Sequence, residues 1–189
     1  MKIAIIDNYD SFTYNLVHAM KKISGLPVQV FLNDEVESGD LKIYDKIVLS
    51  PGPGIPVEAG NLMEIIRVLA PSKSMLGVCL GHQAIGEVFG AKLLNMNKVY
   101  HGIATPVIIT NRNIPLYKGI PDPFEAGRYH SWIVDNDGFP GCFEITGLDT
   151  DGRVMSMKHR EYDLQGVQFH PESVLTPVGE KIIENWLNS

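Results

Sequence analysis

The first half of the chain alternates short hydrophobic runs with longer segments in which polar and apolar positions are mixed. The runs are dominated by aliphatic residues without a polar alternation, as expected of strands buried on both faces of a parallel sheet. They span residues 2–6, 28–32, 46–50 and 75–78. This rhythm predicts a β-α-β-α order, in which helices cover both faces of a mostly parallel sheet.

The segments between these runs repeat apolar residues every three or four positions, which predicts helices. After the first run, the apolar stripe consists of Phe12, Leu16, Met20 and Ile23. Asp10 or Ser11 precedes this stripe and is expected to cap the helix. Further helices are predicted over residues 61–69, 80–90 and 177–187. The last of them would begin with Pro177, where a missing N–H does no harm.

The second half of the chain has β-rich runs separated by turn-forming residues rather than by helical segments. These runs span residues 107–110, 125–130, 142–148, 153–158 and 164–169. Strands joined by short connections pair antiparallel. We therefore expect an α/β fold with a mostly parallel sheet and antiparallel additions in the C-terminal half, forming a single domain over residues 1–189.

Composition and charge narrow the classes of partner. A net charge of −6 leaves too few clustered cations to neutralise phosphates, which argues against nucleic acid. The most apolar long window, residues 75–94, contains His82, Gln83, Glu87 and Lys92 and is not expected to cross a membrane. The N-terminus lacks a signal-peptide core, so a cytoplasmic protein is expected. In that reducing compartment the two cysteines should be free thiols.

A Gly-x-Cys-x-Gly sequence, from Gly77 to Gly81, overlaps the end of the apolar run at 75–78. At a strand-to-helix junction this spacing is typical of a nucleophile elbow, here with Cys79 in place of serine. The flanking glycines permit a tight turn and a close approach of the helix. The helix N-terminus favours the thiolate of Cys79 through its dipole and its free N–H groups. The alternative is a buried structural cysteine in a glycine-containing turn.

The tripeptide His170-Pro171-Glu172 follows the last hydrophobic run. Pro171 disfavours helical angles at His170, so the segment should be extended, with His170 and Glu172 on one side. Together with Cys79 it supplies a nucleophile, a base and an orienting carboxylate. Alone, the tripeptide is more often a surface strand end, and its pairing with Cys79 is what favours catalysis. A metal site from the same three side chains is not favoured, because the close ligand pairs of zinc sites are missing.

The remaining candidates are weaker. The loop Pro51-Gly52-Pro53-Gly54 follows a strand and could offer one N–H to an oxyanion, although a Pro-Gly loop is usually only a turn. His18 and His159 are expected on the surface or on a helix face, and Cys142 should be a strand residue without chemistry. Three further histidines rank below His170: His82, His101 and His130.

Four motifs together resemble those of the class I, triad-type glutamine amidotransferases in order and spacing. They are SPGPG (50–54), GVCLGHQ (77–83), RYHSW (128–132) and QFHPES (168–173), and they extend over most of the chain. The opening DNYDSFTYN (7–15) and the His-Gly of YHGIATPV (100–107) look like the small subunits of anthranilate synthase and aminodeoxychorismate synthase.

The resemblance implies a flavodoxin-like, three-layer core with a Cys-His-Glu triad, here Cys79, His170 and Glu172. It assigns the backbone N–H groups that stabilise an oxyanion to Gly52 and Leu80. The residues that match glutamine-holding positions are Gly52, Pro53, Gly54, Gln83, Ser131 and Trp132. Gln83 lies one helical turn beyond Cys79 and could reach the substrate, unless it is an ordinary solvent-facing helix residue.

Two positions depart from the family pattern. Ile103 stands where a lysine is expected after His-Gly, and Trp132 stands where a leucine is expected after His-Ser. The first departure bears on coupling, if that segment faces a partner subunit. The second matters less, because a backbone contact to glutamine survives a change of side chain.

The activity implied by the resemblance is hydrolysis of L-glutamine to glutamate and ammonia through a cysteinyl thioester, without a metal or an organic cofactor. The ammonia would pass to a chorismate-binding synthase subunit, because no chorismate site is visible in these residues. Three alternatives are the glutaminase part of another amidotransferase such as GMP synthetase, a silent scaffold subunit of the same fold, and a cysteine hydrolase of similar topology. The DNYDSFTYN opening argues against the first alternative and the intact triad against the second. Leu80 directly after Cys79 argues against the third.

Overall fold

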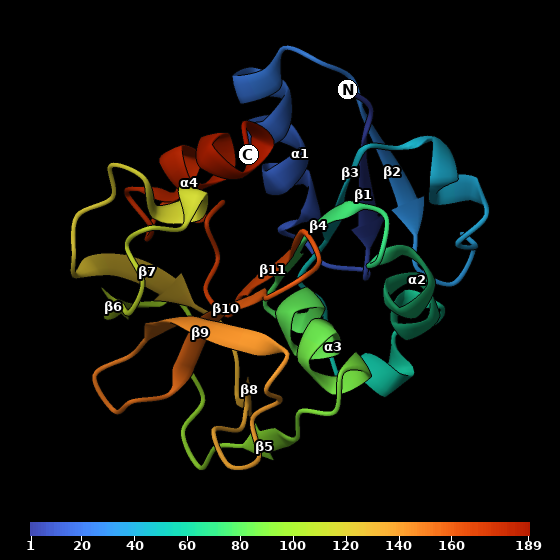
Figure 1. Ribbon diagram of the computed structural model, residues 1–189. Helices are drawn as coiled ribbons and strands as arrows, with labels where there is room; N and C mark the ends of the chain where they lie inside the picture. Colours follow the sequence, from blue (N-terminus) through green and yellow to red (C-terminus); the bar gives the residue numbers. More distant parts are fainter.

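A mixed nine-stranded sheet runs through the centre of the computed structural model, which describes residues 1–189 (Figure 1). Its strand order is β2-β1-β3-β4-β11-β10-β9-β6-β7. The strands from β2 to β11 in this order are parallel, and those from β10 onwards pair antiparallel. The parallel part has the flavodoxin-like order 2-1-3-4-5, with β11 as the fifth strand. The predicted fold class is therefore confirmed, including the antiparallel additions in the C-terminal half.

The strands follow the hydrophobic runs of the sequence closely. The parallel strands are β1 (Ile3–Asp7), β2 (Val28–Leu32), β3 (Lys46–Leu49), β4 (Ser74–Val78) and β11 (Leu164–Val167). The antiparallel strands are β6 (Ile103–Ile109), β7 (Phe124–Arg128), β9 (Phe143–Leu148) and β10 (Val154–His159). A separate small sheet pairs β5 (Leu93–Asn95) with β8 (Trp132–Val134).

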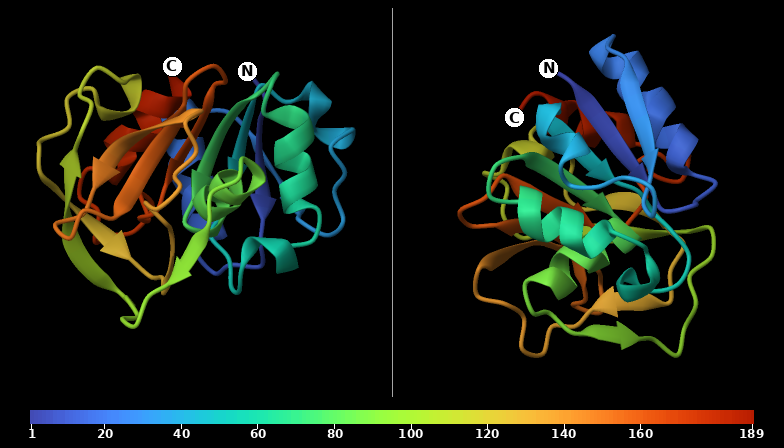
Figure 2. Two further views of the ribbon diagram at one scale, coloured as in Figure 1. Left: turned by 60° about the horizontal axis from the view of Figure 1, so that its bottom comes forward. Right: turned by 90° about the vertical axis from the view of Figure 1, so that its right-hand side faces the viewer.

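Helices cover the two faces of the parallel strands in pairs (Figures 1 and 2). On one face α1 (Thr13–Ser24) contacts α4 (Gly179–Leu187), and on the other α2 (Leu62–Leu69) contacts α3 (Leu80–Val88). Three short 3-10 helices span Asp40–Ile43, Pro56–Glu58 and Pro115–Tyr117.

Two hydrophobic clusters fill the spaces between the sheet and these helices. Successive residues of a strand point to opposite faces, so Ile3 and Ile5 of β1 belong to the cluster under α1 and α4. Ala4 and Ile6 belong to the cluster under α2 and α3. Burial on both faces explains why these strands are apolar without alternation.

Several predicted boundaries and caps differ from the structure. The α1 helix is not capped by a side chain at its N-cap residue, Phe12; instead, the Asp10 carboxylate accepts a hydrogen bond from the Phe12 N–H at 2.8 Å, in the turn before the helix. The α4 helix begins at Gly179 rather than at Pro177. Pro177 and Val178 instead form a turn, in which the Gly179 N–H donates to the carbonyl of Thr176 at 2.9 Å.

Two further differences concern strands. β6 begins at Ile103, four residues before the predicted start, and includes Pro106. Proline is tolerated there because residues 103–107 pair only with β7, and the pairing with β9 is confined to Ile108 and Ile109. The three-residue strands β5 and β8 were not predicted, because segments this short carry no periodicity.

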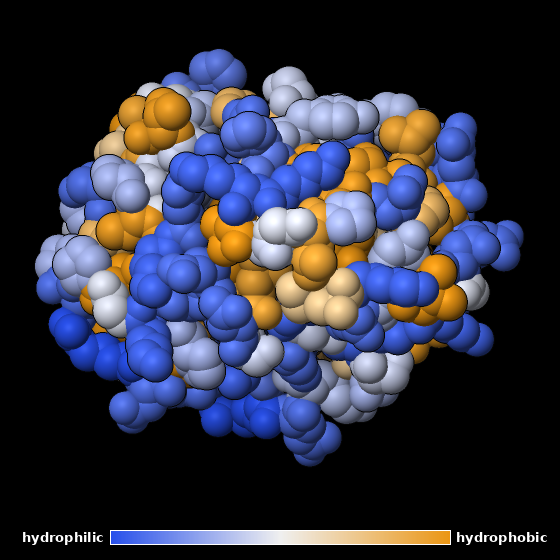
Figure 3. All heavy atoms as spheres, turned by 90° about the horizontal axis from the view of Figure 1, so that it is seen from above, coloured by the Kyte–Doolittle hydropathy of each residue, from blue (hydrophilic) through white to orange (hydrophobic).

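On the face shown in Figure 3, hydrophilic residues separate smaller hydrophobic groups. None of the helices combines the length and the hydrophobicity needed to cross a membrane.

Candidate active site

Cys79 occupies a sharp bend between β4 and α3. Its backbone angles are φ 51° and ψ −100°, a conformation that costs a non-glycine residue about 1–3 kcal/mol. The surroundings enforce the bend: the Cys79 N–H donates to the carbonyl of Val167 at 2.9 Å, and a Cβ at Gly81 would overlap the Leu49 carbonyl. The predicted elbow is therefore present, with the thiol at the N-terminus of α3, where backbone N–H groups have no partner within the helix.

His170 reaches the same edge of the sheet from the neighbouring strand. β11 pairs with β4 in parallel, with Val167 opposite Val78, so the residues after both strands emerge side by side. The Nδ1 atom of His170 lies 2.7 Å from Oε1 of Glu172. Both side chains are at most 2% exposed. The expected extended conformation was wrong, because Pro171 and Glu172 form a turn in which the Ser173 N–H donates to the His170 carbonyl at 3.2 Å. This turn brings the carboxylate of Glu172 against the imidazole.

The protonation of His170 is governed by its two neighbours. Burial lowers the pKa of His170, but interactions with the Cys79 thiol and with Glu172 outweigh it and raise the pKa to about 10. The imidazolium is therefore favoured when the sulfur is ionised. A thiolate paired with an imidazolium is the form in which a thiol is nucleophilic at neutral pH.

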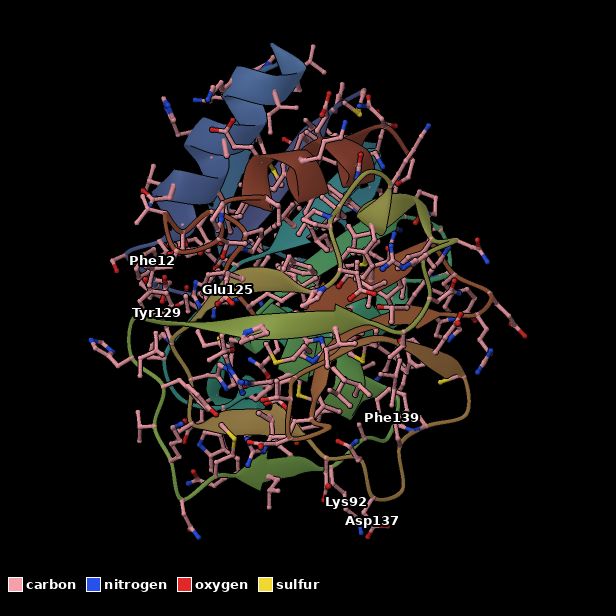
Figure 4. All side chains as sticks on the ribbon, turned by 90° about the vertical axis from the view of Figure 1, so that its left-hand side faces the viewer. Phe12, Lys92, Glu125, Tyr129, Asp137 and Phe139 are labelled. Atoms are coloured by element: carbon pink, nitrogen blue, oxygen red, sulfur yellow. The ribbon has the colours of Figure 1, made fainter.

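Two aromatic rings hold the imidazole in place. The centroid of the His170 ring lies 4.8 Å from that of Tyr129 and 5.4 Å from that of Phe12, and these two rings lie 4.9 Å apart. Figure 4 shows Phe12 and Tyr129 next to each other at this edge of the molecule. The half-buried Phe12 therefore contacts the site, whereas Leu16 and Met20 of the predicted stripe are buried in the core.

A cavity of about 160 Å³ opens beside the thiol. Every residue predicted to hold a small-molecule substrate lines it together with Cys79: Gly52, Pro53, Gly54, Gln83, Ser131 and Trp132. Tyr129 and His130 complete the wall. Leu80, His170 and Glu172 are not part of the lining, because Leu80 packs under Gly52 and Glu172 lies beyond His170.

The opening motif of the chain supports one wall of this cavity. Asn8 donates from its side chain to the carbonyl of Ser50 at 2.8 Å, and its N–H donates to Oγ of Ser50 at 2.9 Å. The loop that begins at Ser50 is therefore tied to the end of β1. A Cβ at Gly52 would lie 2.5 Å from Cδ2 of Leu80 and 2.6 Å from Cβ of Asn8, so only glycine fits there.

Two polar residues at the site received little weight in the sequence analysis. Gln168 is fully buried, and its Nε2 lies 3.6 Å from Sγ of Cys79. His130, ranked below His170, accepts from Nε of Arg128 at 3.1 Å and donates to the carbonyl of Trp132 at 3.0 Å. Both residues lie inside the motifs RYHSW and QFHPES, but their contacts join distant segments and leave no local pattern.

The remaining histidines and cysteines, and Ile103, lie outside the cavity. His18 and His101 are exposed. Ile103, at the start of β6, is exposed as well. The expectation for His159 was wrong: it is buried and stacks on Tyr162, because β10 turns it toward an aromatic cluster. His82 is buried in α3, and burial lowers its pKa to about 3. Cys79 and Cys142 are both free.

Comparison with known proteins gives one family. The family model of class-I glutamine amidotransferases matches residues 4–189. The aminodeoxychorismate synthase component 2 of Escherichia coli (strain K12) is 42% identical over 188 residues, which cover 98% of this chain and 99% of that protein. The anthranilate synthase component 2 of Saccharolobus solfataricus is 43% identical over 190 residues, which cover 97% of this chain and 96% of that protein.

One relative is much longer. The bifunctional protein TrpGD of Thermotoga maritima is 41% identical over 190 residues, covering 99% of this chain but only 32% of that protein. Among solved structures, a glutamine amidotransferase of Thermotoga maritima superposes with a TM-score of 0.79 at 15% identity, covering 100% of this chain and 96% of that one. A protein of Thermoplasma acidophilum, described as a candidate component of GMP synthase, gives 0.89 at 24% identity, with coverages of 100% and 92%. These likenesses concern the fold.

Proposed function

The chain belongs to the class-I glutamine amidotransferase family, and from this membership we propose that its 189 residues act as one glutaminase domain that supplies ammonia to a synthase subunit. The observation that carries the proposal is the arrangement at the carboxyl edge of the sheet. There a thiol on a strained bend, an imidazole with a raised pKa and a buried carboxylate meet beside a small-molecule cavity.

In the proposed mechanism the Cys79 thiolate attacks the side-chain carbonyl carbon of glutamine. The carbonyl oxygen becomes an oxyanion, which accepts hydrogen bonds from the N–H groups of Leu80 and Gly52. Each such donor contributes on the order of 3–4 kcal/mol to lowering the barrier. The tight contact between Gly52 and Leu80 supports this assignment, because it holds the two backbone segments next to each other beside the sulfur.

Collapse of the tetrahedral intermediate breaks the C–N bond. The His170 imidazolium, oriented by Glu172, gives its proton to the departing ammonia and is left neutral, while the acyl group stays on sulfur as a thioester. The neutral imidazole then takes a proton from water, whose oxygen attacks the thioester and releases glutamate. The imidazolium and the thiolate are restored together. No metal or organic cofactor enters the proposed cycle.

The substrate would lie in the cavity beside Cys79. Gly52, Pro53, Gly54, Gln83, Ser131 and Trp132 are the proposed contacts. Gln83 is only 3% exposed and hydrogen bonded to the carbonyl of Trp132 at 2.8 Å, which argues against the solvent-facing alternative. The cytoplasm is the proposed location, since reducing conditions keep the thiol of Cys79 free.

The proposed partner is a synthase subunit that aminates chorismate. Relatives that match nearly the whole chain are second components of aminodeoxychorismate synthase and of anthranilate synthase. Their identities to this chain, 42% and 43%, do not separate the two products. Ile103, at 44% exposure, lies on the surface where a lysine was expected and is available to a docked subunit.

We expect the isolated chain to hydrolyse glutamine slowly and to speed up when a chorismate-using synthase subunit binds. The measurement is glutamate release with and without the partner, followed by identification of the glutamine-dependent product from chorismate. A rise in rate together with anthranilate or aminodeoxychorismate would support the proposal. Equal rates with and without the partner would argue against ammonia delivery.

Replacing Gly52 by alanine should lower the rate of glutamine hydrolysis by about 10²-fold, the loss typical of a displaced oxyanion donor. The added methyl group would collide with Leu80 and Asn8 and push the loop away from the thiol. Steady-state kinetics on the purified variant measure the effect. Gly39→Ala is the matched control, because a Cβ at Gly39 meets nothing within 4 Å. A wild-type kcat in Gly52→Ala would show that the N–H of Gly52 does not stabilise the oxyanion.

A further inference from the structure

A buried ion pair lies behind the cavity wall. Arg128 donates from Nη1 to Oδ2 of Asp149 at 2.8 Å, with both side chains no more than 2% exposed, and its guanidinium lies 3.8 Å from the ring centroid of Tyr100. The Nε of the same guanidinium donates to Nε2 of His130 at 3.1 Å. Arginine has donors only, so this contact defines which ring nitrogen of His130 must accept.

The tautomer of His130 follows from that contact. Its Nε2 accepts from Arg128, so its single proton is on Nδ1, which faces the carbonyl of Trp132 at 3.0 Å. Burial and the adjacent Arg128 cation lower the pKa of His130 to about 3, so the ring is neutral at physiological pH. A neutral ring with one donor and one acceptor satisfies both neighbours.

The carbonyl of Trp132 also orients Gln83. A backbone carbonyl can only accept, so the end of the Gln83 amide that lies 2.8 Å from it must be the NH2 group. The same Nε2 lies 3.2 Å from the amide of Gln168. Gln168 therefore turns its oxygen toward Gln83, and its own NH2 group must point the other way, where Sγ of Cys79 lies 3.6 Å distant.

We propose that Gln168 is a further catalytic residue, which donates a hydrogen bond from Nε2 to Sγ of Cys79 and stabilises the thiolate. The donor direction of this bond is imposed by the Trp132 carbonyl, which can only accept and therefore orients Gln83, and by Gln83, which orients Gln168. With the amide flipped, its oxygen would face the thiolate and two NH2 groups would face each other. The inference rests on the proposed role of Cys79 as the nucleophile.

The thiolate is the form of Cys79 that depends on this bond. Hydrogen bonds to charged groups are stronger than those between neutral groups, so a donor fixed on the sulfur favours ionisation. Gln168 is fully buried, and its amide is held at the opposite end by Gln83, so the donor need not be reoriented during the reaction. In the proposed cycle the imidazolium of His170 supplies the charge that balances the thiolate, and Gln168 supplies a neutral donor to the sulfur.

The test measures the ionisation of the Cys79 thiol without substrate. Alkylation by iodoacetamide is followed against pH in a Cys142→Ala background, so that only Cys79 reacts. Gln168→Met removes the donor, and Gln168→Glu keeps the shape and the bond accepted from Gln83 but puts an oxygen against the sulfur. Gln165→Leu is the matched control, a buried glutamine on β11 with no contact to Cys79.

The midpoint is the pH at which the alkylation rate of Cys79 reaches half of its maximum, as the thiol ionises. We expect this midpoint to rise by about one pH unit in Gln168→Met, which corresponds to a tenfold smaller thiolate fraction below the midpoint. The rise should be larger in Gln168→Glu. The kcat for glutamine should fall in parallel, and Gln165→Leu should match the parent in both. An unchanged midpoint in the folded variants, with only a lower melting temperature, would overturn the proposal. If Gln168→Met does not fold, the midpoint measured in the isosteric Gln168→Glu variant tests the proposal in its place.

This outcome is independent of the proposed activity. A parent protein that shows no glutamine hydrolysis with any chorismate-using partner would refute the glutaminase function, but its thiol could still be titrated. Conversely, full glutaminase activity with an unshifted midpoint in Gln168→Glu would reject only the role of Gln168.

Discussion

Replacement of Cys79 by alanine is expected to reduce glutamine hydrolysis by on the order of 10⁴-fold or more, since loss of the nucleophile in a catalytic triad removes nearly the whole covalent pathway. The fold should be unaffected, because alanine keeps the Cβ and so meets the same backbone strain at φ 51°. Circular dichroism and glutamate release, measured on the same preparation, check both parts.

A second assay separates the nucleophile from the rest of the complex. With the synthase subunit bound, the Cys79→Ala variant should still support product formation from added ammonium salt, because the partner needs only ammonia. Cys142→Ala is the control for thiol loss in general and should retain glutamine-dependent activity, since Cys142 lies outside the cavity. Unchanged glutaminase turnover in Cys79→Ala would falsify the assignment of the nucleophile.

The parallel half of the fold and the order of the motifs could be predicted because they depend on local pattern. A strand such as β1, whose residues Ile3 to Ile6 are buried on both faces, has to be apolar along that stretch. The bend at Cys79 likewise requires glycine at Gly77 and Gly81, where a Cβ would collide with backbone. Constraints of this kind act on neighbouring residues and so leave a signature that can be read without a structure.

What could not be predicted depends on contacts between distant segments. The tautomer of His130 is determined by Arg128 and by a carbonyl, and the orientation of Gln168 by Gln83, which lies 85 residues earlier in the chain. Buried glutamine and exposed glutamine look alike in a sequence.

The ion pair between Arg128 and Asp149 should be the most sensitive polar contact for stability. We expect Asp149→Asn to lower the free energy of unfolding by about 3–5 kcal/mol at pH 7, because it leaves the Arg128 cation buried without its counter-charge. Urea denaturation followed by tryptophan fluorescence measures the change. Asp151→Asn is the control: its carboxylate is 59% exposed, and its bond to Arg153 should contribute less than about 1 kcal/mol.

The pH dependence gives this prediction a second, independent readout. Burial raises the pKa of Asp149, but hydrogen bonds from the backbone of Arg153 and from Arg128 outweigh it, so the folded-state pKa lies below the unfolded value of about 3.9. Unfolding at acidic pH therefore takes up a proton, and the contribution of Asp149 is present above about pH 4 and is lost as the pH falls through its folded-state pKa. The difference in stability between the parent and Asp149→Asn should accordingly narrow on acidification below pH 4. A constant difference from pH 7 down to pH 3 would show that the carboxylate charge of Asp149 is not what stabilises Arg128.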